Sequence, residues 1–124
     1  MEGALPVEIA SGIILFVEKF QDCYQFYRNG MQLPILMEKP GLVRFAFGSM
    51  YLQIEDAKLF GAEPTCNIII RKNVPSISHT QLELEGKGIV LEVHDLEWGK
   101  IGFVYDPNGN KVEYFREKQQ SAGS

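Results

Sequence analysis

The chain has 124 residues, 45% of them hydrophobic and 23% charged, which suits one globular domain large enough to bury a core. Its net charge of −4 comes without a basic cluster, so we expect no nucleic-acid surface, because phosphate binding depends on clustered Lys and Arg. The early apolar run at residues 13–17 is too short for a membrane span and lacks the basic start of a signal peptide. Two cysteines suit a reducing compartment. We therefore expect a cytoplasmic protein that does not bind membranes.

The first half of the chain predicts the element order β-α-β-β-β. Residues 12–17 are apolar and β-branched, which is typical of a strand. A helix follows, with a helical stripe of four side chains: Phe20, Cys23, Tyr24 and Tyr27. We expect Cys23 to lie in the core and Gly30 to end the helix. Turn residues then separate three short predicted strands, at 33–37, 42–47 and 50–54.

The second half predicts the same order again. Residues 67–70 indicate a strand, and Pro75 or Ser76 starts a weaker helical stretch that ends near Gly86. Three more strands are predicted, at 88–93, 101–105 and 111–116. The spacing from strand to helix end is similar in the two halves, which indicates an internal repeat. We expect one domain over residues 1–124, with modules at about 9–57 and 65–117 and a flexible tail at 118–124.

The last two predicted strands form a hairpin, the strongest local signal in the chain. Their connection is Asp106-Pro107-Asn108-Gly109-Asn110, in which Asp and Asn side chains can bond the local backbone and Gly accepts positive φ. The second strand carries a carboxylate, Glu113, at a position that should be half buried. A carboxylate there must be solvated, paired or bound to a ligand.

Strand alternation predicts which residues face away from the helices. Two sheets that each carry a helix on one face would form a cup with their other faces. The expected cup wall is apolar and aromatic: Gly12, Ile14, Phe16, Tyr51, Trp98, Phe103, Tyr105 and Phe115. Its polar groups are few: Gln53, Glu55, Asn67, Arg71 and Glu113. A wall of this kind is typical of a small-molecule pocket.

Three local patterns together resemble the vicinal oxygen chelate superfamily, also called the glyoxalase/bleomycin resistance/dioxygenase fold. They are the first strand followed by FYRNGM at 26–31, the WG pair at 98–99, and the hairpin DPNGN at 106–110 with Glu113. The hairpin is the most specific of the three. The resemblance covers nearly the whole chain and implies an α+β fold, in which two βαβββ modules form curved mixed sheets around a cup-shaped pocket. It also implies a homodimer.

In metal-dependent members of that superfamily, His, Glu or Gln side chains on the first and last strands of the modules hold a divalent ion. The resemblance places the last-strand ligand on Glu113, and Gln53 or Glu55 at the matching strand of the first module. The first-strand positions fall near Ser11 or Gly12 and on Cys66 or Asn67, where histidines would be expected. Glu113, Gln53 and Cys66 are thus the metal candidates, although a free Cys is more often a small buried hydrophobe.

The missing histidines beside retained aromatic residues favour a protein that binds a flat or amphipathic small molecule without metal. The expected ligand-binding residues are Phe16, Tyr51, Gln53, Glu55, Asn67, Trp98, Phe103, Glu113 and Phe115. Glu113 or Glu55 would select a cationic or hydroxylated group. The resemblance leaves a metal-dependent lyase, isomerase or dioxygenase as the alternative, with Glu113 as the best catalytic candidate. A structural or regulatory module with a vestigial cup is the third possibility.

Overall fold

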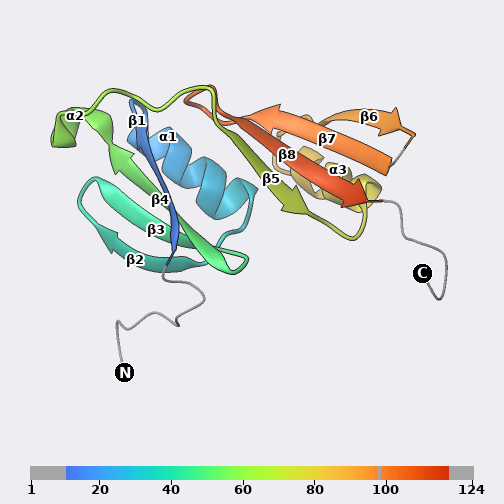
Figure 1. Cartoon of the computed structure of the whole chain (residues 1–124), viewed down its shortest axis with the longest axis horizontal. Helices are drawn as coiled ribbons and strands as arrows, with labels where there is room; N and C mark the ends of the chain where they lie inside the picture. Colours follow the sequence, from blue (N-terminus) through green and yellow to red (C-terminus); the bar gives the residue numbers. More distant parts are fainter. Residues whose placement is uncertain (1–10, 98, 118–124) are drawn as a thin grey trace. The chain divides into compact units, whose positions relative to one another are not determined.

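The computed structural model describes residues 11–97 and 99–117. The chain divides into two compact units, which we call the N-terminal unit (Met1–Cys66) and the C-terminal unit (Asn67–Ser124). Each unit contains one four-stranded mixed sheet and the element order βαβββ (Figure 1). The α+β fold expected from the doubled sequence pattern is therefore confirmed.

In the N-terminal unit, the sheet order β1-β4-β3-β2 places the first strand beside the last. The elements are β1 (Gly12–Val17), α1 (Phe20–Gln25), a π-helical turn η2 (Phe26–Gly30), β2 (Ile35–Lys39), β3 (Leu42–Phe47), β4 (Met50–Asp56) and a short α2 (Ala57–Phe60). Strand β1 runs parallel to β4, whereas β4, β3 and β2 form antiparallel pairs.

The C-terminal unit has the corresponding sheet order, β5-β8-β7-β6, with β5 parallel to β8. Its elements are β5 (Ile69–Asn73), α3 (Ile77–Glu85), β6 (Glu92–Leu96), β7 (Gly99–Tyr105) and β8 (Lys111–Glu117). Ser76 caps α3, because its Oγ accepts a hydrogen bond from His79 N at 3.1 Å. None of the helices within residues 11–97 and 99–117 is long and apolar enough to cross a membrane.

The core of the N-terminal unit contains two large aromatic rings among aliphatic side chains. Tyr27 and Phe45 are both fully buried, and their ring centroids lie 6.2 Å apart. Cys23 of α1 and Leu15 of β1 are also fully buried, so the prediction that Cys23 lies in the core is confirmed. Burial of this apolar area is the main favourable term in folding.

The core of the C-terminal unit is mostly aliphatic. Helix α3 buries Ile77 and Leu84, and the sheet buries Val112 and Tyr114. Leu91 covers Gly102 so closely that a Cβ at Gly102 would lie 2.7 Å from Leu91 Cδ2. A side chain at this point of β7 would therefore force Leu91 to shift.

Several sequence predictions need correction. The strand predicted at residues 88–93 is β6, which begins only at Glu92, because residues 86–88 turn and Leu91 enters the core before the strand starts. The helical segment ends at Gly30 as predicted, but the residue with a left-handed backbone is Gln32, with φ of 58°. Cys66, which we expected to be a buried hydrophobe, is exposed.

Candidate functional site

We call the sheet face opposite the helix of the same unit the distal face. In the N-terminal unit, the register of β1 with β4 places Phe16 beside Glu55 on this face, together with Tyr51 and Gln53. In the C-terminal unit, the register of β8 with β5 and β7 brings together Arg71, Phe103 and Glu113, with Phe115 on the same face. Most of the predicted ligand-binding residues therefore lie on the two distal faces.

The hairpin between β7 and β8 fixes the position of Glu113. Asp106 Oδ1 accepts hydrogen bonds from Asn108 N at 2.8 Å and Asn110 N at 2.9 Å, which closes the turn. Gly109 has the positive φ, 89°, that the turn needs. Asn110 is fully buried, and its Oδ1 accepts from Ile68 N at 3.2 Å. The turn thus ties the approach to β5 to the start of β8 and sets the register of Glu113 in the sheet.

The carboxylate of Glu113 is buried and paired. The residue is 7% exposed, and its Oε1 accepts from Arg71 Nε at 3.0 Å and from Arg71 Nη2 at 2.9 Å. The Arg71 guanidinium also lies 4.7 Å from the centroid of the Phe115 ring. The second oxygen, Oε2, has Lys111 Nζ at 4.0 Å, which is beyond hydrogen-bond distance. Oε2 can therefore accept a hydrogen bond from a bound molecule.

Phe103 is the centre of an aromatic and cationic row on the same face. Lys111 Nζ lies 4.4 Å from the Phe103 ring centroid, and the His94 ring stacks on Phe103 at 5.8 Å with an interplanar angle of 8°. Tyr105 meets Phe103 edge-on at 6.0 Å. His94 Nε2 in turn lies 2.8 Å from Glu92 Oε2. The row combines flat apolar surface with polar groups, as small-molecule sites do.

Sequence reasoning missed His94 and Lys111 as members of this face. The strand was predicted at residues 88–93, which put His94 at its end, whereas His94 lies in the middle of β6. Alternation of Glu92, His94 and Leu96 along the actual strand is the signal that could have found it. Lys111 begins β8, where a charged residue reads most simply as solvated.

The distal face of the N-terminal unit has a similar arrangement, with the neutral residue Gln53 at the position that corresponds to Glu113. Gln53 is 5% exposed, and its Oε1 accepts from Arg44 Nε at 2.7 Å. Its Nε2 donates to Glu55 Oε2 at 2.6 Å. The Arg44 guanidinium lies 4.3 Å from the centroid of the Tyr51 ring. Gln53 thus bridges the Arg44 guanidinium and the Glu55 carboxylate by two hydrogen bonds.

The remaining predicted residues lie elsewhere. Asn67 precedes β5 with a φ of 61°, and the exposed Cys66 precedes Asn67. Trp98 lies outside the described residues. Two hydrogen bonds join the Phe16 backbone to Thr65: Phe16 N donates to Thr65 Oγ1 at 2.9 Å, and Thr65 N donates to Phe16 O at 2.7 Å. They hold the end of the N-terminal unit along β1.

The contacts within each unit do not fit a divalent metal ion, the group that the family resemblance implies. The Glu113 carboxylate already faces the Arg71 guanidinium, and Gln53 faces that of Arg44, so a second cation at either point would be repelled. Across the described ranges, no group of three or more His, Cys, Asp or Glu side chains could hold an ion. Three or more such ligands are the usual requirement for zinc.

Comparison with known proteins identifies the fold. Neither a family model nor a curated protein matches the sequence. Among solved structures, a lactoylglutathione lyase from Agrobacterium tumefaciens matches with a TM-score of 0.74 and 20% identity, over 90% of this chain and 95% of that chain. A glyoxalase/bleomycin resistance protein/dioxygenase from Nocardioides matches with a TM-score of 0.74 and 18% identity, over 98% of this chain and 89% of that chain.

An antibiotic-binding protein from a Streptomyces species also matches, with a TM-score of 0.70 and 15% identity, over 93% of this chain and 100% of that chain. At these identities the likeness establishes the fold and leaves chemistry to the residues of each protein. The chain has the fold of the glyoxalase/bleomycin resistance/dioxygenase proteins, as the resemblance of its hairpin and its doubled modules predicted.

Proposed function

We propose that the protein binds a small aromatic or amphipathic molecule, without a metal ion, on the distal face of the C-terminal unit. One observation carries this proposal: a buried carboxylate, Glu113, is held by Arg71 among aromatic rings, and its Oε2 faces Lys111 Nζ only at 4.0 Å, beyond hydrogen-bond distance. The fold likeness to an antibiotic-binding protein supports a binding role.

The aromatic side chains supply contact area for the ligand. Phe103 and Phe115 are half-buried, and each has a cation over its ring, so their orientations are set before a ligand arrives. A flat ligand can stack beside such rings, and aromatic pairs contribute about 0.5–1.5 kcal/mol beyond their buried area.

The polar groups supply selectivity. Glu113 Oε2 can accept a hydrogen bond from a hydroxyl or an amine of the ligand. The Arg71 side chain is 51% exposed and can donate to an acceptor on the same ligand. We therefore expect a ligand that carries a hydroxyl or amino group on a planar apolar body. The sequence-predicted residues of the N-terminal unit, Phe16, Tyr51, Gln53 and Glu55, offer a second surface of similar chemistry.

The alternative proposal, a metal-dependent lyase, isomerase or dioxygenase, has the fold likeness to lactoylglutathione lyase in its favour. In that case Glu113 would have to exchange Arg71 for a metal ion. Elemental analysis of protein purified without chelator, together with a metal-ion thermal-shift panel, separates the two proposals. Stoichiometric metal would favour the enzyme.

The resemblance also leads us to propose a homodimer. Sedimentation at micromolar concentration tests this proposal, and a monomer there would contradict it.

A binding experiment tests the role of Glu113. We would screen planar aromatic compounds with hydroxyl or amino groups by thermal shift and measure the best one by calorimetry. Glu113→Gln should weaken its affinity by at least roughly tenfold, because a hydrogen bond to a charged group is worth about 1.5–3 kcal/mol. Glu85→Gln, the same change on an exposed residue of α3, is the control. Equal affinity of the Glu113 variant and the wild type would refute the assignment.

A further inference from the structure

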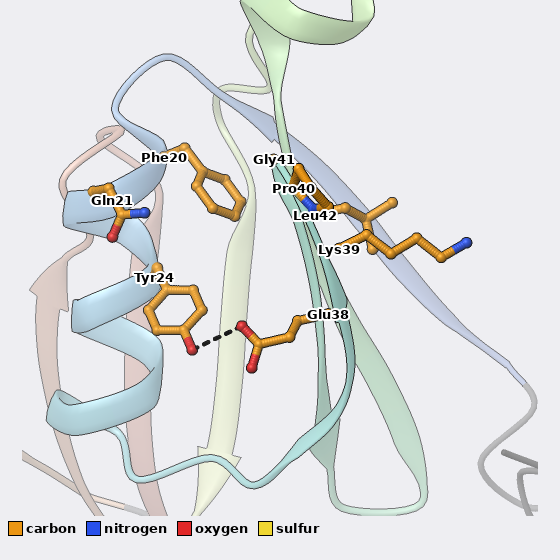
Figure 2. Close-up of a pocket in the computed structure, with 8 residues that line it drawn as sticks. All are labelled: Phe20, Gln21, Tyr24, Glu38, Lys39, Pro40, Gly41 and Leu42. Atoms are coloured by element: carbon orange, nitrogen blue, oxygen red, sulfur yellow. Dashed lines mark hydrogen bonds between the residues drawn. The ribbon is translucent and has the colours of Figure 1, made fainter.

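The N-terminal unit contains a pocket on the helix side of its sheet, away from the distal face. Its volume is about 400 Å³. Helix α1 supplies one wall and the hairpin of β2 and β3 supplies the other (Figure 2). This size lies within the range of about 300–1,000 Å³ that is typical of small-molecule sites.

The α1 wall presents two aromatic rings. Phe20 and Tyr24, one helical turn apart, have ring centroids 6.2 Å apart at an angle of 53°. Tyr24 also lies 6.2 Å from the buried ring of Phe45, which anchors the wall to the core. Across the gap, Pro40 and Leu42 of the hairpin add apolar side chains to a lining that also contains the polar residues Gln21, Glu38 and Lys39.

The hairpin wall carries one carboxylate that faces the rings. Tyr24 donates a hydrogen bond from its hydroxyl to Glu38 Oε1 at 3.1 Å (Figure 2). The Lys39 side chain extends away from Tyr24 and Glu38 in the same view, so its charge does not face the carboxylate. Desolvation, and then the hydrogen bond to Glu38 and its charge, raise the pKa of Tyr24 above its ordinary value of 10.0, against a smaller opposing effect of Arg28.

The hairpin wall is held in place by its turn. Gly41 has a φ of 74°, and a Cβ there would lie 2.4 Å from Leu59 Cδ2 of α2, so the turn packs closely on that helix. Gly41 O also accepts from Asp56 N at 2.8 Å. The pocket is therefore bounded on both sides by anchored elements.

We propose that this pocket binds a small organic cation, with its ammonium group between the Phe20 and Tyr24 rings and the Glu38 carboxylate and its apolar body against Pro40 and Leu42. Aromatic faces together with a carboxylate are the usual recognition elements for ammonium groups. The site belongs to a different unit and a different sheet face from the site at Glu113, so the two can be tested separately.

The test is an NMR titration of the ¹⁵N-labelled chain with 2-phenylethylammonium and with the neutral 2-phenylethanol. We expect the ammonium compound to bind at least about fivefold more tightly, because only it gains the carboxylate and cation–π terms. Its largest amide shifts should fall at Tyr24, Glu38 and Gly41. A ligand on the distal face of the C-terminal unit would instead shift residues around Glu113.

Matched variants assign the selectivity. Glu38→Gln should abolish the preference for the ammonium compound, and Phe20→Leu should reduce it while keeping an apolar side chain. Glu85→Gln removes an exposed carboxylate elsewhere and should leave the preference intact. The proposal is overturned by equal binding of both compounds, by no detectable binding at millimolar concentration, or by a preference that survives Glu38→Gln.

Discussion

The two units share one architecture and one central device, yet they distribute charge differently. In each unit a polar side chain in the last strand is buried on the distal face, Gln53 with 5% exposure and Glu113 with 7%. Each accepts a hydrogen bond from an arginine whose guanidinium lies over an aromatic ring of the same last strand. Gln53 accepts from Arg44, which lies over Tyr51, and Glu113 accepts from Arg71, which lies over Phe115.

The two units differ in the strand that supplies the arginine and in the side chain to which the arginine donates. Arg44 belongs to β3, the antiparallel neighbour, and reaches Glu55 only through the neutral amide of Gln53. Arg71 belongs to β5, the parallel edge strand, and meets the Glu113 carboxylate directly. Both units therefore place an arginine over an aromatic ring, but the residue at the centre of the distal face is neutral in one unit and a carboxylate in the other. Only the C-terminal unit places an ionisable group at that central position.

The largest expected effect concerns the two cores. Phe45→Ala should lower the free energy of unfolding by about 3–5 kcal/mol, because it leaves a cavity among Tyr24 and Tyr27. Leu84→Ala, in the aliphatic core of the C-terminal unit, should cost roughly 2–3 kcal/mol. Urea denaturation measures both losses. A larger loss for Leu84→Ala would contradict the expectation that the buried Phe45 ring contributes more than a single aliphatic side chain.

Alkaline pH sharpens the comparison of the cores. Burial, with a smaller effect of Glu83, raises the pKa of Tyr114 from its ordinary value of 10.0 to about 12. Between these pH values the unfolded chain releases a proton that the folded chain retains, so stability should fall by about 2–3 kcal/mol as pH rises from 10 to 12. Tyr114→Phe should remove this part of the decline. Parallel pH profiles for wild type and variant would contradict the assignment.

Exchanging the central residues tests the charge difference itself. Gln53→Glu replaces the hydrogen bond to Glu55 with repulsion between two carboxylates, which the attraction of Arg44 offsets only in part. It should cost roughly 1–3 kcal/mol at pH 7, a loss that should shrink as the pH is lowered toward 4. Glu113→Gln should cost less than about 1 kcal/mol, because its amide oxygen can still accept from the half-exposed Arg71. Thermal or urea unfolding across this pH range gives both values. Equal costs for the two substitutions would show that the units are electrostatically equivalent.

The smallest expected effect is the salt dependence of the two arginine pairs. Double-mutant cycles with Arg71→Met and Glu113→Ala should give a coupling of about 1 kcal/mol that decreases as NaCl is raised. The matched cycle with Arg44→Met and Gln53→Ala should give a coupling that salt changes little, because one partner is neutral. Methionine keeps the apolar stem of the arginine over its ring. The same salt response in both cycles would remove the distinction.

Most of the fold could be predicted from the sequence, because period and turn residues are local signals. The 20–27 stripe, the cap at Ser76 and the closing hairpin all stand where the residues indicated. The start of β6 could not be predicted, because it depends on Leu91 packing over Gly102, a contact between segments that the sequence alone does not join. Helix α2 is only four residues long and depends on the Asp56 cap, so it carries no periodic signal.

The candidate site was only partly predictable. Alternation along the strands placed Gln53 and Glu113 on the face away from the helix, as the register confirms. The partner of Glu113 could not be predicted, because Arg71 lies 42 residues earlier and meets it only through the parallel register of β5 and β8. The sequence left open whether this carboxylate is solvated, paired or bound to a ligand. The structure shows that it is paired, with both hydrogen bonds from Arg71 on one oxygen.

The most direct test of the central claim is an NMR titration of ¹⁵N-labelled wild type and Glu113→Gln with the strongest aromatic compound from the thermal-shift screen. Binding on the distal face of the C-terminal unit predicts the largest amide shifts at Arg71, Phe103 and Glu113, and an affinity for the variant that is weaker by at least roughly tenfold. Shifts confined to other residues, or an unchanged affinity of the variant, would contradict it.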